Sequence, residues 1–325
     1  MNKTKIAILG YGVIGKGIFE ICKNIEYIEV VKILERKERF DEKYLDLFTD
    51  NIDEIINNEE IKIIVEVLGG YDFAKSVIVK SLEAKKCVVT ANKEVIAKDI
   101  DSLILLSKNN NVELAFEASV GGGIPIIKSI KELVKINKIS KISGILNGTT
   151  NYILTKMHEG ISFNDALKDA QQKGFAELDP TADLEGYDMM RKIAILSDLA
   201  WNTYVDINKV KHQGISNIKE SDIKEALKKN KVIKFVCEST LVNGNINIEV
   251  APKVFDNNHF FSNVNNEFNA VILETYPNDV LTFIGKGAGS MPTASAVVLD
   301  VIQIIENKHE NDYQNINKYI INSEV

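Results

Sequence analysis

The chain has 325 residues, enough for a sizeable core and for two domains, since domains usually span roughly 100 to 200 residues. A hydrophobic content of 45%, a charged content of 26% and a net charge of −7 are typical of a soluble globular protein. They argue against a dedicated nucleic-acid binder, which would carry a basic patch. The lysine-rich segments Lys135–Lys141 and Lys224–Lys234 are expected to be solvated faces.

The cysteine pattern and the N-terminus indicate a compartment. No apolar run reaches the ~18–20 residues of a membrane helix, and the chain opens on a strand pattern rather than a signal peptide. The widely spaced cysteines contain no CxxC motif, which argues against a disulfide framework or a zinc knuckle. We therefore expect a cytoplasmic protein with the free thiols Cys22, Cys87 and Cys237.

The N-terminal part of the chain alternates short apolar runs with helical patterns, as in βαβ units on a parallel sheet. The segment 41–58 is weakly patterned and is left without an expected structure. The expected strands are Lys5–Leu9, Val30–Leu34, Ile63–Val67, Cys87–Thr90 and Val112–Phe116, and the expected helices are Gly15–Asn24, Asp72–Glu83 and Val95–Lys108.

The pattern changes near Ile126 to that of an α+β domain. Trp201 is expected to pack in the core of this part, and the polar residues at the end of the chain are expected to fray. The expected helices are Pro125–Ile136, Thr149–Glu159, Ser162–Lys173, Gly186–Trp201 and Pro292–Ile305, and the expected strands are Ile139–Leu146, Val232–Leu241, Ile246–Val250, Ala270–Thr275 and Val280–Ile284.

A GxGxxG motif lies between the first expected strand and helix, as Gly10-Tyr11-Gly12-Val13-Ile14-Gly15. The first glycine permits the tight turn, the second lets the backbone approach a pyrophosphate, and the third lets helix and strand pack closely. The start of the helix offers free N–H groups to phosphates. The strand–turn–helix context predicts a dinucleotide site, against the alternative of a glycine-rich turn without a ligand.

The residues that follow the second expected strand bear on the choice of coenzyme. Glu35 lies 20 residues after Gly15, near where an acidic residue binds the ribose of NAD. Arg36 or Lys37 could instead pair with the 2′-phosphate of NADP, since a guanidinium suits bidentate phosphate contacts. We expect a slight preference for NADP, with a solvated charged loop as the alternative.

The stretch 171–192 collects charged residues beside an apolar helix pattern. Asp188 and Lys192 lie one helical turn apart and therefore share a face. A site that holds a small zwitterion and moves a proton needs such a set, and with the dinucleotide motif it suggests redox chemistry on an amino-acid-like substrate. The charged residues between 177 and 192 are Glu177, Asp179, Asp183, Glu185, Asp188, Arg191 and Lys192.

Several motifs in the same order resemble homoserine dehydrogenase, which interconverts L-homoserine and L-aspartate 4-semialdehyde with NAD(P). The resemblance implies an α/β fold with an N-terminal doubly wound Rossmann domain (1–130), an α+β substrate and dimerisation domain (131–288), and a C-terminal helix (289–325) that returns to the first domain. It rests on Gly10–Gly17, Thr90–Lys93 (TANK), Glu117–Pro125, Gly144–Leu154, Gly174–Lys192 and Gly285–Asp300.

The resemblance also assigns roles to residues. Lys192 matches the family's catalytic lysine, with Asp188 to orient it, and Lys93 is a second candidate for proton transfer. Glu177 matches the carboxylate that binds the substrate's amino group, and Thr149 in the GTTN segment helps hold the substrate or shape the domain junction. The residues implied to contact the coenzyme are Gly10, Gly12, Val13, Ile14, Gly15, Arg36, Lys37, Thr90, Lys93 and Gly287.

A monovalent cation loop and the assembly state follow from the same resemblance. A sodium ion would be held by the carboxylate of Glu117 and the carbonyls of Val120, Gly122 and Ile124, because hard cations favour oxygen ligands. The resemblance implies a homodimer that reduces the semialdehyde for threonine and methionine synthesis. Little chain follows the last expected helix, so it also implies a short, monofunctional form without the ACT regulatory domain.

Two other functions are compatible with parts of the sequence. A thioester-forming semialdehyde dehydrogenase would need an activated cysteine with a base nearby, and neither Cys22 nor Cys87 has an adjacent histidine. A dinucleotide-sensing module without catalysis would leave the charged residues between Glu177 and Lys192 unexplained. The scattered histidines are expected to be structural or exposed: His158, His212, His259 and His309.

Overall fold

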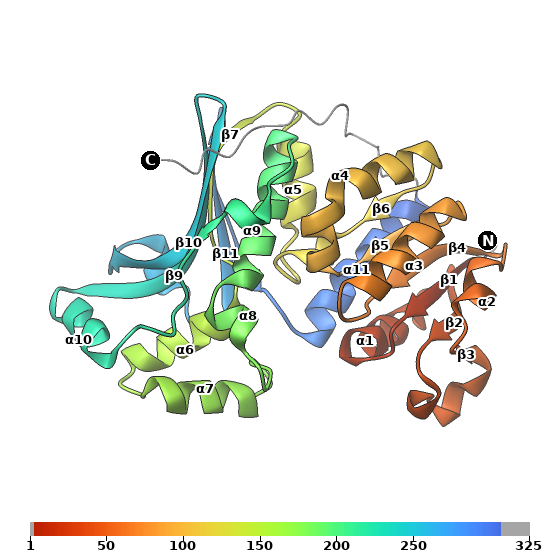
Figure 1. The fold of residues 1–325 in the computed structure, drawn as a ribbon, viewed down its shortest axis with the longest axis horizontal. Helices are drawn as coiled ribbons and strands as arrows, with labels where there is room; N and C mark the ends of the chain where they lie inside the picture. The colour runs from red at the N-terminus through yellow and green to blue at the C-terminus, as the bar shows by residue number, and fades with distance from the viewer. Residues whose placement is uncertain (1–2, 307–325) are drawn as a thin grey trace. The chain divides into compact units, whose positions relative to one another are not determined.

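The computed structural model describes residues 3–306. They form two compact units, each with a six-stranded sheet (Figure 1). One unit contains the chain up to Pro125 and the segment that begins at Gly289, and the other contains Ile126–Ala288. The predicted polar tail and His309 lie outside the described residues, as does the rest of the predicted segment 289–325.

The first unit is a doubly wound α/β domain, with a parallel sheet in the order β3-β2-β1-β4-β5-β6. The order in which strands are added to the sheet reverses between β1 and β4. Ligands in such folds bind outside the carboxyl ends of the strands at that point. Its strands are β1 (Thr4–Leu9), β2 (Ile28–Leu34), β3 (Phe48–Thr49), β4 (Ile61–Glu66), β5 (Cys87–Thr90) and β6 (Leu114–Ala115), and its helices are α1 (Val13–Cys22), α2 (Ile52–Ile56), α3 (Asp72–Glu83), α4 (Lys93–Asn109) and α11 (Ser290–Ile305).

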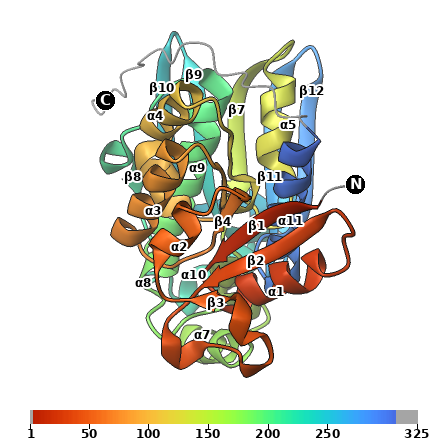
Figure 2. The same ribbon diagram turned by 90° about the vertical axis from the view of Figure 1, so that its right-hand side faces the viewer.

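Apolar residues on both faces of the strands hold these layers together. Side chains alternate between the faces of a strand, so Ile6 and Ile8 pack against α1 and α11, whereas Ala7 and Leu9 pack against residues of α2 and α3. In Figure 2, α1 and α11 lie on one side of β1 and β2, and α2 and α3 lie on the other. The packing of α11 on α1 confirms the prediction that the last helix returns to the first domain.

The structure defines one segment of this unit that the sequence left open, and it shortens one predicted strand. The segment 41–58, left without an expected structure, forms the 3₁₀ turn η2 (Glu42–Leu47), the edge strand β3 and the short helix α2. The predicted strand Val112–Phe116 shortens to Leu114–Ala115, because Glu117–Ser119 turns into the 3₁₀ segment η3. Short elements of this kind depend on tertiary contacts rather than on a sustained sequence period.

The second unit is an α+β domain whose sheet has the order β12-β11-β7-β9-β10-β8. Neighbouring strands are antiparallel except for β8, which runs parallel to β10. Its strands are β7 (Lys138–Ile145), β8 (Lys211–His212), β9 (Lys231–Val242), β10 (Asn245–Asp256), β11 (Phe268–Tyr276) and β12 (Asp279–Lys286), and its helices are α5 (Ile126–Leu133), α6 (Gly148–His158), α7 (Phe163–Gln172), α8 (Thr181–Leu184), α9 (Tyr187–Trp201) and α10 (Glu220–Lys228).

Helices α6 and α9 pack on this sheet. Helix α6 begins with the GTTN segment, and α9 carries Asp188 and Lys192. Trp201, at the end of α9, is buried and donates its indole N–H to the carbonyl of Ile139 at 2.8 Å, which confirms its predicted place in the core. The expectation that Lys224–Lys234 is a solvated face holds for Lys224 but is wrong at the other end, where Lys234 on β9 is only 2% exposed. Within the segment, helix α10 also buries Ala226. No helix among residues 3–306 is long and apolar enough to cross a membrane.

Candidate functional site

The turn after β1 has the geometry that a dinucleotide requires. Gly10 has a φ of +101°, and a Cβ there would lie 2.9 Å from the carbonyl oxygen of Val67. A Cβ on Gly15 would lie 2.0 Å from the carbonyl oxygen of Gly10, whereas a Cβ on Gly12 would meet no atom within 4 Å. Gly10 and Gly15 therefore allow the turn and the close packing, and Gly12 leaves open the approach that a pyrophosphate needs.

Helix α1 begins at the motif with Val13, followed by Ile14, and the exposed Val13 carbonyl accepts a hydrogen bond from Ser290 at 2.8 Å. No acidic residue lies in the first turn of α1. The helix dipole and the backbone N–H groups of this turn therefore remain favourable to an anion.

The end of β2 places the three residues that bear on coenzyme choice. The carboxylate of Glu35 accepts the backbone N–H of Tyr11 at 3.0 Å and that of Arg36 at 3.0 Å. Glu35 thus ties the end of β2 to the glycine turn. Arg36 and Lys37 are exposed, and Lys37 forms an ion pair with Asp50 at 3.3 Å.

The end of β5 carries the TANK motif. Thr90 is the buried last residue of β5, and Lys93 is the half-buried first residue of α4. Between them, Asn92 caps α4 by accepting the backbone N–H of Val95 at 3.2 Å. These residues lie at the carboxyl edge of the parallel sheet, where α/β folds bind ligands.

The loop after β6 contains the predicted cation ligands Glu117, Val120, Gly122 and Ile124. Glu117 is 9% exposed, and its backbone N–H donates to Asp300 on α11 at 2.9 Å. The chain then turns through Gly121 and Gly122 with φ values of +75° and +55°. One buried carboxylate beside a tight glycine turn is a donor set that fits a hard monovalent cation.

The second unit places Asp188 and Lys192 together on α9, and both are buried. Lys192 Nζ lies 2.8 Å from Asp188 Oδ2 and donates to the carbonyl of Leu146 at 2.7 Å. Asn147 donates its side-chain N–H to the same Asp188 oxygen at 2.9 Å and to Asp183 at 2.7 Å. A surface ion pair, the simplest alternative for this spacing, is excluded, since the side chains are only 10% and 3% exposed.

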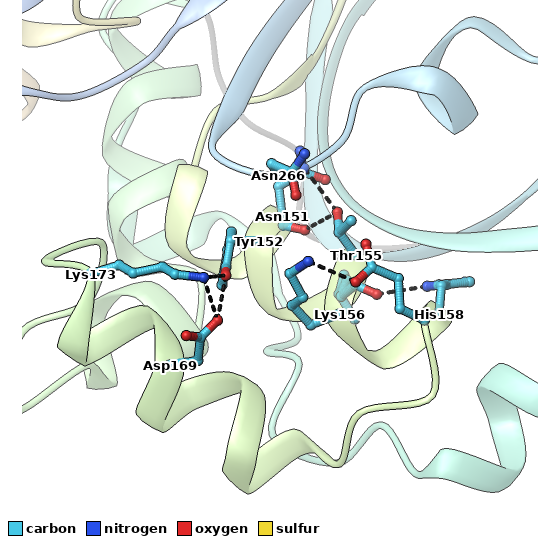
Figure 3. Close-up of polar contacts among 10 residues, drawn as sticks. Asn151, Tyr152, Thr155, Lys156, His158, Asp169, Lys173 and Asn266 are labelled. Carbon is cyan, nitrogen blue, oxygen red and sulfur yellow. Dashed lines mark hydrogen bonds and ion pairs between the residues drawn. The ribbon is translucent and has the colours of Figure 1, made fainter.

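The loop with Glu177 is attached to helices α6 and α7. Thr149, at the start of α6, donates its hydroxyl to the carbonyl of Phe175 at 2.5 Å. Tyr152 packs its ring on Phe175. Its hydroxyl donates to Asp169 and accepts from Lys173 at 2.6 Å, and Figure 3 shows these three side chains together. These contacts fix the base of the loop, and Glu177 stands exposed beyond it.

Gly287 lies in the second unit, at the end of β12. A Cβ on Gly287 would lie 1.8 Å from the side-chain nitrogen of the buried Asn269, so this position accepts only glycine. The other coenzyme candidates and the cation candidates lie in the first unit, whereas Gly287 lies in the second unit together with Asp188, Lys192, Thr149 and Glu177.

The three cysteines do not have the properties of nucleophiles. All are free thiols, and burial raises the pKa of Cys22 to about 12 and that of Cys87 to about 11. Burial also raises the pKa of Cys237. A thioester-forming enzyme needs a thiolate near neutral pH. The burial of these thiols and their raised pKa values therefore argue against that alternative.

Two family models match consecutive parts of the chain. Residues 10–117 match the NAD binding domain of homoserine dehydrogenase, and residues 125–302 match the homoserine dehydrogenase domain. The second match alone covers more than half of the chain. The chain belongs to the homoserine dehydrogenase family. It is therefore an NAD(P)-dependent oxidoreductase of amino-acid biosynthesis.

Curated homoserine dehydrogenases are similar to the chain over most of its length. The Bacillus subtilis enzyme is 37% identical over 322 residues, which cover 94% of this chain and 74% of the relative. The Synechocystis enzyme is 38% identical over 320 residues, which cover 93% of this chain and 73% of the relative. The chain thus spans about three quarters of these two relatives.

Solved homoserine dehydrogenases share the fold. The enzyme from Thiobacillus denitrificans superposes with a TM-score of 0.91 at 32% identity, over 98% of this chain and 77% of that one. A hyperthermophilic archaeal homoserine dehydrogenase, in complex with NADPH, superposes with a TM-score of 0.82 at 26% identity, over 97% of this chain and 100% of that one.

The sequence did not predict that Asn147 contacts Asp188, the partner of Lys192. Asn147 precedes the glycine of the GTTN segment and caps α6 by accepting the N–H of Thr150 at 2.8 Å. An asparagine before a helix pattern signals a cap. The contacts of its amide with Asp183 and Asp188 cross between helices, so no local pattern could reveal them.

Proposed function

We propose that Lys192 is the proton donor and acceptor in the interconversion of L-aspartate 4-semialdehyde and L-homoserine by this chain. The observation that carries the proposal is the buried contact of its ammonium with Asp188 Oδ2 and the carbonyl of Leu146. An ammonium has three N–H donors, and these two contacts use two of them. The third is available to a substrate oxygen.

Reduced nicotinamide supplies the hydride when it is bound. As the hydride reaches the aldehyde carbon, negative charge develops on the oxygen, and Lys192 donates a proton to it. In the reverse direction the neutral amine accepts the hydroxyl proton. Asp188 holds the amine in place and is itself held by the amide of Asn147. Lys93, at the carboxyl edge of the Rossmann sheet, is the second candidate for proton transfer.

Substrate recognition is assigned to the loop and helix start beside this pair. Glu177 would bind the substrate's amino group as a carboxylate, and its exposure leaves it accessible. Thr149 would act by shaping this site, because its hydroxyl already donates to the carbonyl of Phe175. The cluster of Tyr152, Asp169 and Lys173 would hold the loop in position.

We propose that NADP is the preferred coenzyme, with its 2′-phosphate on Arg36. The carboxylate of Glu35 already accepts two backbone N–H groups, and Lys37 forms an ion pair with Asp50. Arg36 is exposed and follows the end of β2. A charge-assisted contact contributes about 1.5–3 kcal/mol. Arg36→Ala should therefore raise the KM for NADPH at least about tenfold and leave that for NADH nearly unchanged; equal changes for both coenzymes would exclude this role.

Two further features belong to the proposal. The loop of Glu117, Val120, Gly122 and Ile124 would hold a sodium ion that rigidifies the segment after β6. Replacing sodium by choline at constant ionic strength should then lower activity, and potassium should restore it only in part. The chain would function as a cytoplasmic homodimer that reduces the semialdehyde toward threonine and methionine.

The direct test supplies NADPH or NADH with L-aspartate 4-semialdehyde and follows the loss of absorbance. Substrate-dependent oxidation of NADPH, with homoserine as product, is expected. Turnover that survives thiol alkylation would exclude a thioester mechanism. Tight coenzyme binding without any turnover would instead favour the non-catalytic dinucleotide-sensing module.

A further inference from the structure

Glu66 is a buried carboxyl group to which the proposed reaction gives no role. It is the last residue of β4, at the carboxyl edge of the Rossmann sheet, and it is 0% exposed. Burying a carboxyl group is unfavourable unless hydrogen bonds satisfy it. The partners of Glu66 therefore indicate what it does.

The carboxyl group joins two neighbouring turns of the sheet edge. Its Oε1 accepts the backbone N–H of Leu68 at 2.7 Å, in the turn after β4. Its Oε2 accepts the hydroxyl of Thr90, at the end of β5. The same threonine oxygen accepts the backbone N–H of Asn92 at 2.9 Å. One side chain thus connects the turn after β4 to the TANK turn through Thr90.

This connection extends to the start of α4 and to the glycine turn. Asn92 donates its side-chain N–H to the carbonyl of Gly70 at 2.8 Å and caps the helix that begins at Lys93. The residue after Glu66, Val67, lies against Gly10, where its carbonyl oxygen leaves room only for a glycine. The turns after β1, β4 and β5 therefore form one contiguous set of contacts around Glu66.

We propose that Glu66 is a positioning residue that holds Thr90 and Lys93 in register with the glycine turn for coenzyme binding and hydride transfer. It touches neither substrate nor coenzyme, because it is fully buried, and acts through Thr90. Catalysis depends on placement of the reacting groups to within about 1 Å, and a misplacement of that size can cost about 10²-fold in rate. The inference rests on the proposed function of this sheet edge.

The protonation of Glu66 suggests the informative substitution. Burial raises the pKa of its carboxyl group to about 7, so the uncharged acid is well populated at neutral pH. Glutamine has the shape of this uncharged acid and keeps an oxygen for the N–H of Leu68 and a group for Thr90. Aspartate is one methylene shorter and cannot span both turns.

The experiment compares Glu66→Gln, Glu66→Asp and Glu66→Ala with the wild-type chain. Thermal unfolding confirms that each variant folds, NADPH fluorescence titration measures the coenzyme Kd, and steady-state assays separate kcat from KM. Glu66→Gln should stay within about threefold of wild type in the coenzyme Kd, in KM and in kcat. Glu66→Asp and Glu66→Ala should raise the coenzyme Kd and KM and lower kcat by about 10- to 100-fold.

Lys86 offers a matched control for the loss of a buried polar contact, because it lies at the amino-terminal ends of the same two strands, β4 and β5. It is 4% exposed, lies just before β5, and donates to the carbonyls of Asn58 at 2.6 Å and Ile61 at 2.8 Å. Lys86→Met also removes a buried polar link between the starts of β4 and β5. It should lower the unfolding temperature but leave Kd, KM and kcat close to wild type.

Thr90 tests whether Glu66 acts through it. Thr90→Val removes the hydroxyl that donates to Glu66 and should reproduce the effect of Glu66→Asp on the coenzyme Kd. Combining Thr90→Val with Glu66→Asp should add little to either change alone, since both break one connection.

The inference is overturned if folded Glu66→Asp and Glu66→Ala bind NADPH and turn over like wild type, or if they differ from it only as Lys86→Met does. The coenzyme titration needs no turnover. If the wild-type chain failed to reduce the semialdehyde, the proposed function would fall, while the effect of Glu66 on coenzyme affinity would still be measured separately.

Discussion

At the scale of single residues, residues 3–306 contain three buried lysines with different surroundings. Lys192 faces a carboxylate and a carbonyl, and its third N–H remains available. Lys234 is bonded by the carbonyl of Val264 and the side chain of Asn265, and burial lowers its pKa to about 8. Lys86 bonds only backbone carbonyls. Burial alone therefore does not distinguish the proposed catalytic amine, whereas the carboxylate partner of Lys192 does.

Lys192→Arg and Lys192→Met separate proton transfer from ion pairing. Arginine keeps a positive charge beside Asp188 but is not deprotonated in proteins, so it cannot replace an acid–base amine. Both variants should lower kcat by about 10²- to 10⁴-fold with little change in the coenzyme Kd. The measurement is steady-state kinetics with NADPH titration.

Lys234→Met is the matched control for this prediction, because it removes a buried amine from the same unit. It should lower the unfolding temperature and spare kcat. Near wild-type activity in Lys192→Arg would show that Lys192 serves only to pair with Asp188.

At the scale of elements, most of the proposed site residues lie where helices begin or strands end. Helix α6 illustrates this: its first turn carries Thr149, and its last residue, His158, ties it to β9. His158 Nδ1 lies 2.7 Å from the carbonyl of Leu154, and Nε2 accepts the backbone N–H of Ile233 at 3.0 Å. This pair of contacts requires the neutral ring, with its proton on Nδ1.

His158 predicts a loss of stability in mild acid. Burial lowers its pKa in the folded chain below the usual 6.5, so the unfolded chain binds the proton first as the pH falls. Stability is then present above about pH 6.5 and declines as the pH falls toward the lower folded pKa, with a slope of at most about 1.4 kcal/mol per pH unit. Urea unfolding between pH 7.5 and 5 measures this slope.

Other groups titrate in the same range, so the slope must be compared between variants. His158→Gln should reduce the acid-dependent loss, because glutamine does not titrate. His212→Gln, at an exposed position on β8, should retain the wild-type slope. The same slope in His158→Gln as in wild type would exclude His158 as the source.

At the scale of the whole molecule, the sheet of the second unit ends in an edge strand that could pair with another chain. In the described part of the chain, β12 is the last strand of its sheet, and it exposes Val280 and Ile284, each 55% exposed. Exposed edge strands with apolar side chains tend to pair with another chain. This supports the proposed homodimer.

Substitution on β12 tests the dimer. Sedimentation equilibrium should give about twice the mass of one chain for the wild type, and Ile284→Glu should shift it toward the monomer, because an unpaired buried charge is strongly unfavourable at an interface. Leu105→Glu is the control, since Leu105 is similarly exposed, at 59%, but lies on α4 in the first unit. A wild-type mass equal to that of one chain would end this proposal.

The local patterns of the sequence were sufficient for most long elements. The alternation of apolar residues predicted β1, β5 and α3 almost to the residue, and the spacing of Asp188 and Lys192 predicted their contact. The short elements in 41–58 and the helix α10 were missed, because short or lysine-rich segments lack a sustained apolar period. The burial of Lys234 was missed for the same reason.

The sequence by itself determined the glycine turn and most of the long helices and strands, because each depends on residues close together in the chain whose periods and spacings encode local geometry. The family followed from the resemblance of several motifs in the same order along the chain. Only the tertiary structure decided which polar groups are buried together. The links from Glu66 to Thr90 and from Asn147 to Asp188 join segments that are distant in sequence. Such partners are selected by the packing of whole strands and helices, and no local pattern contains that information.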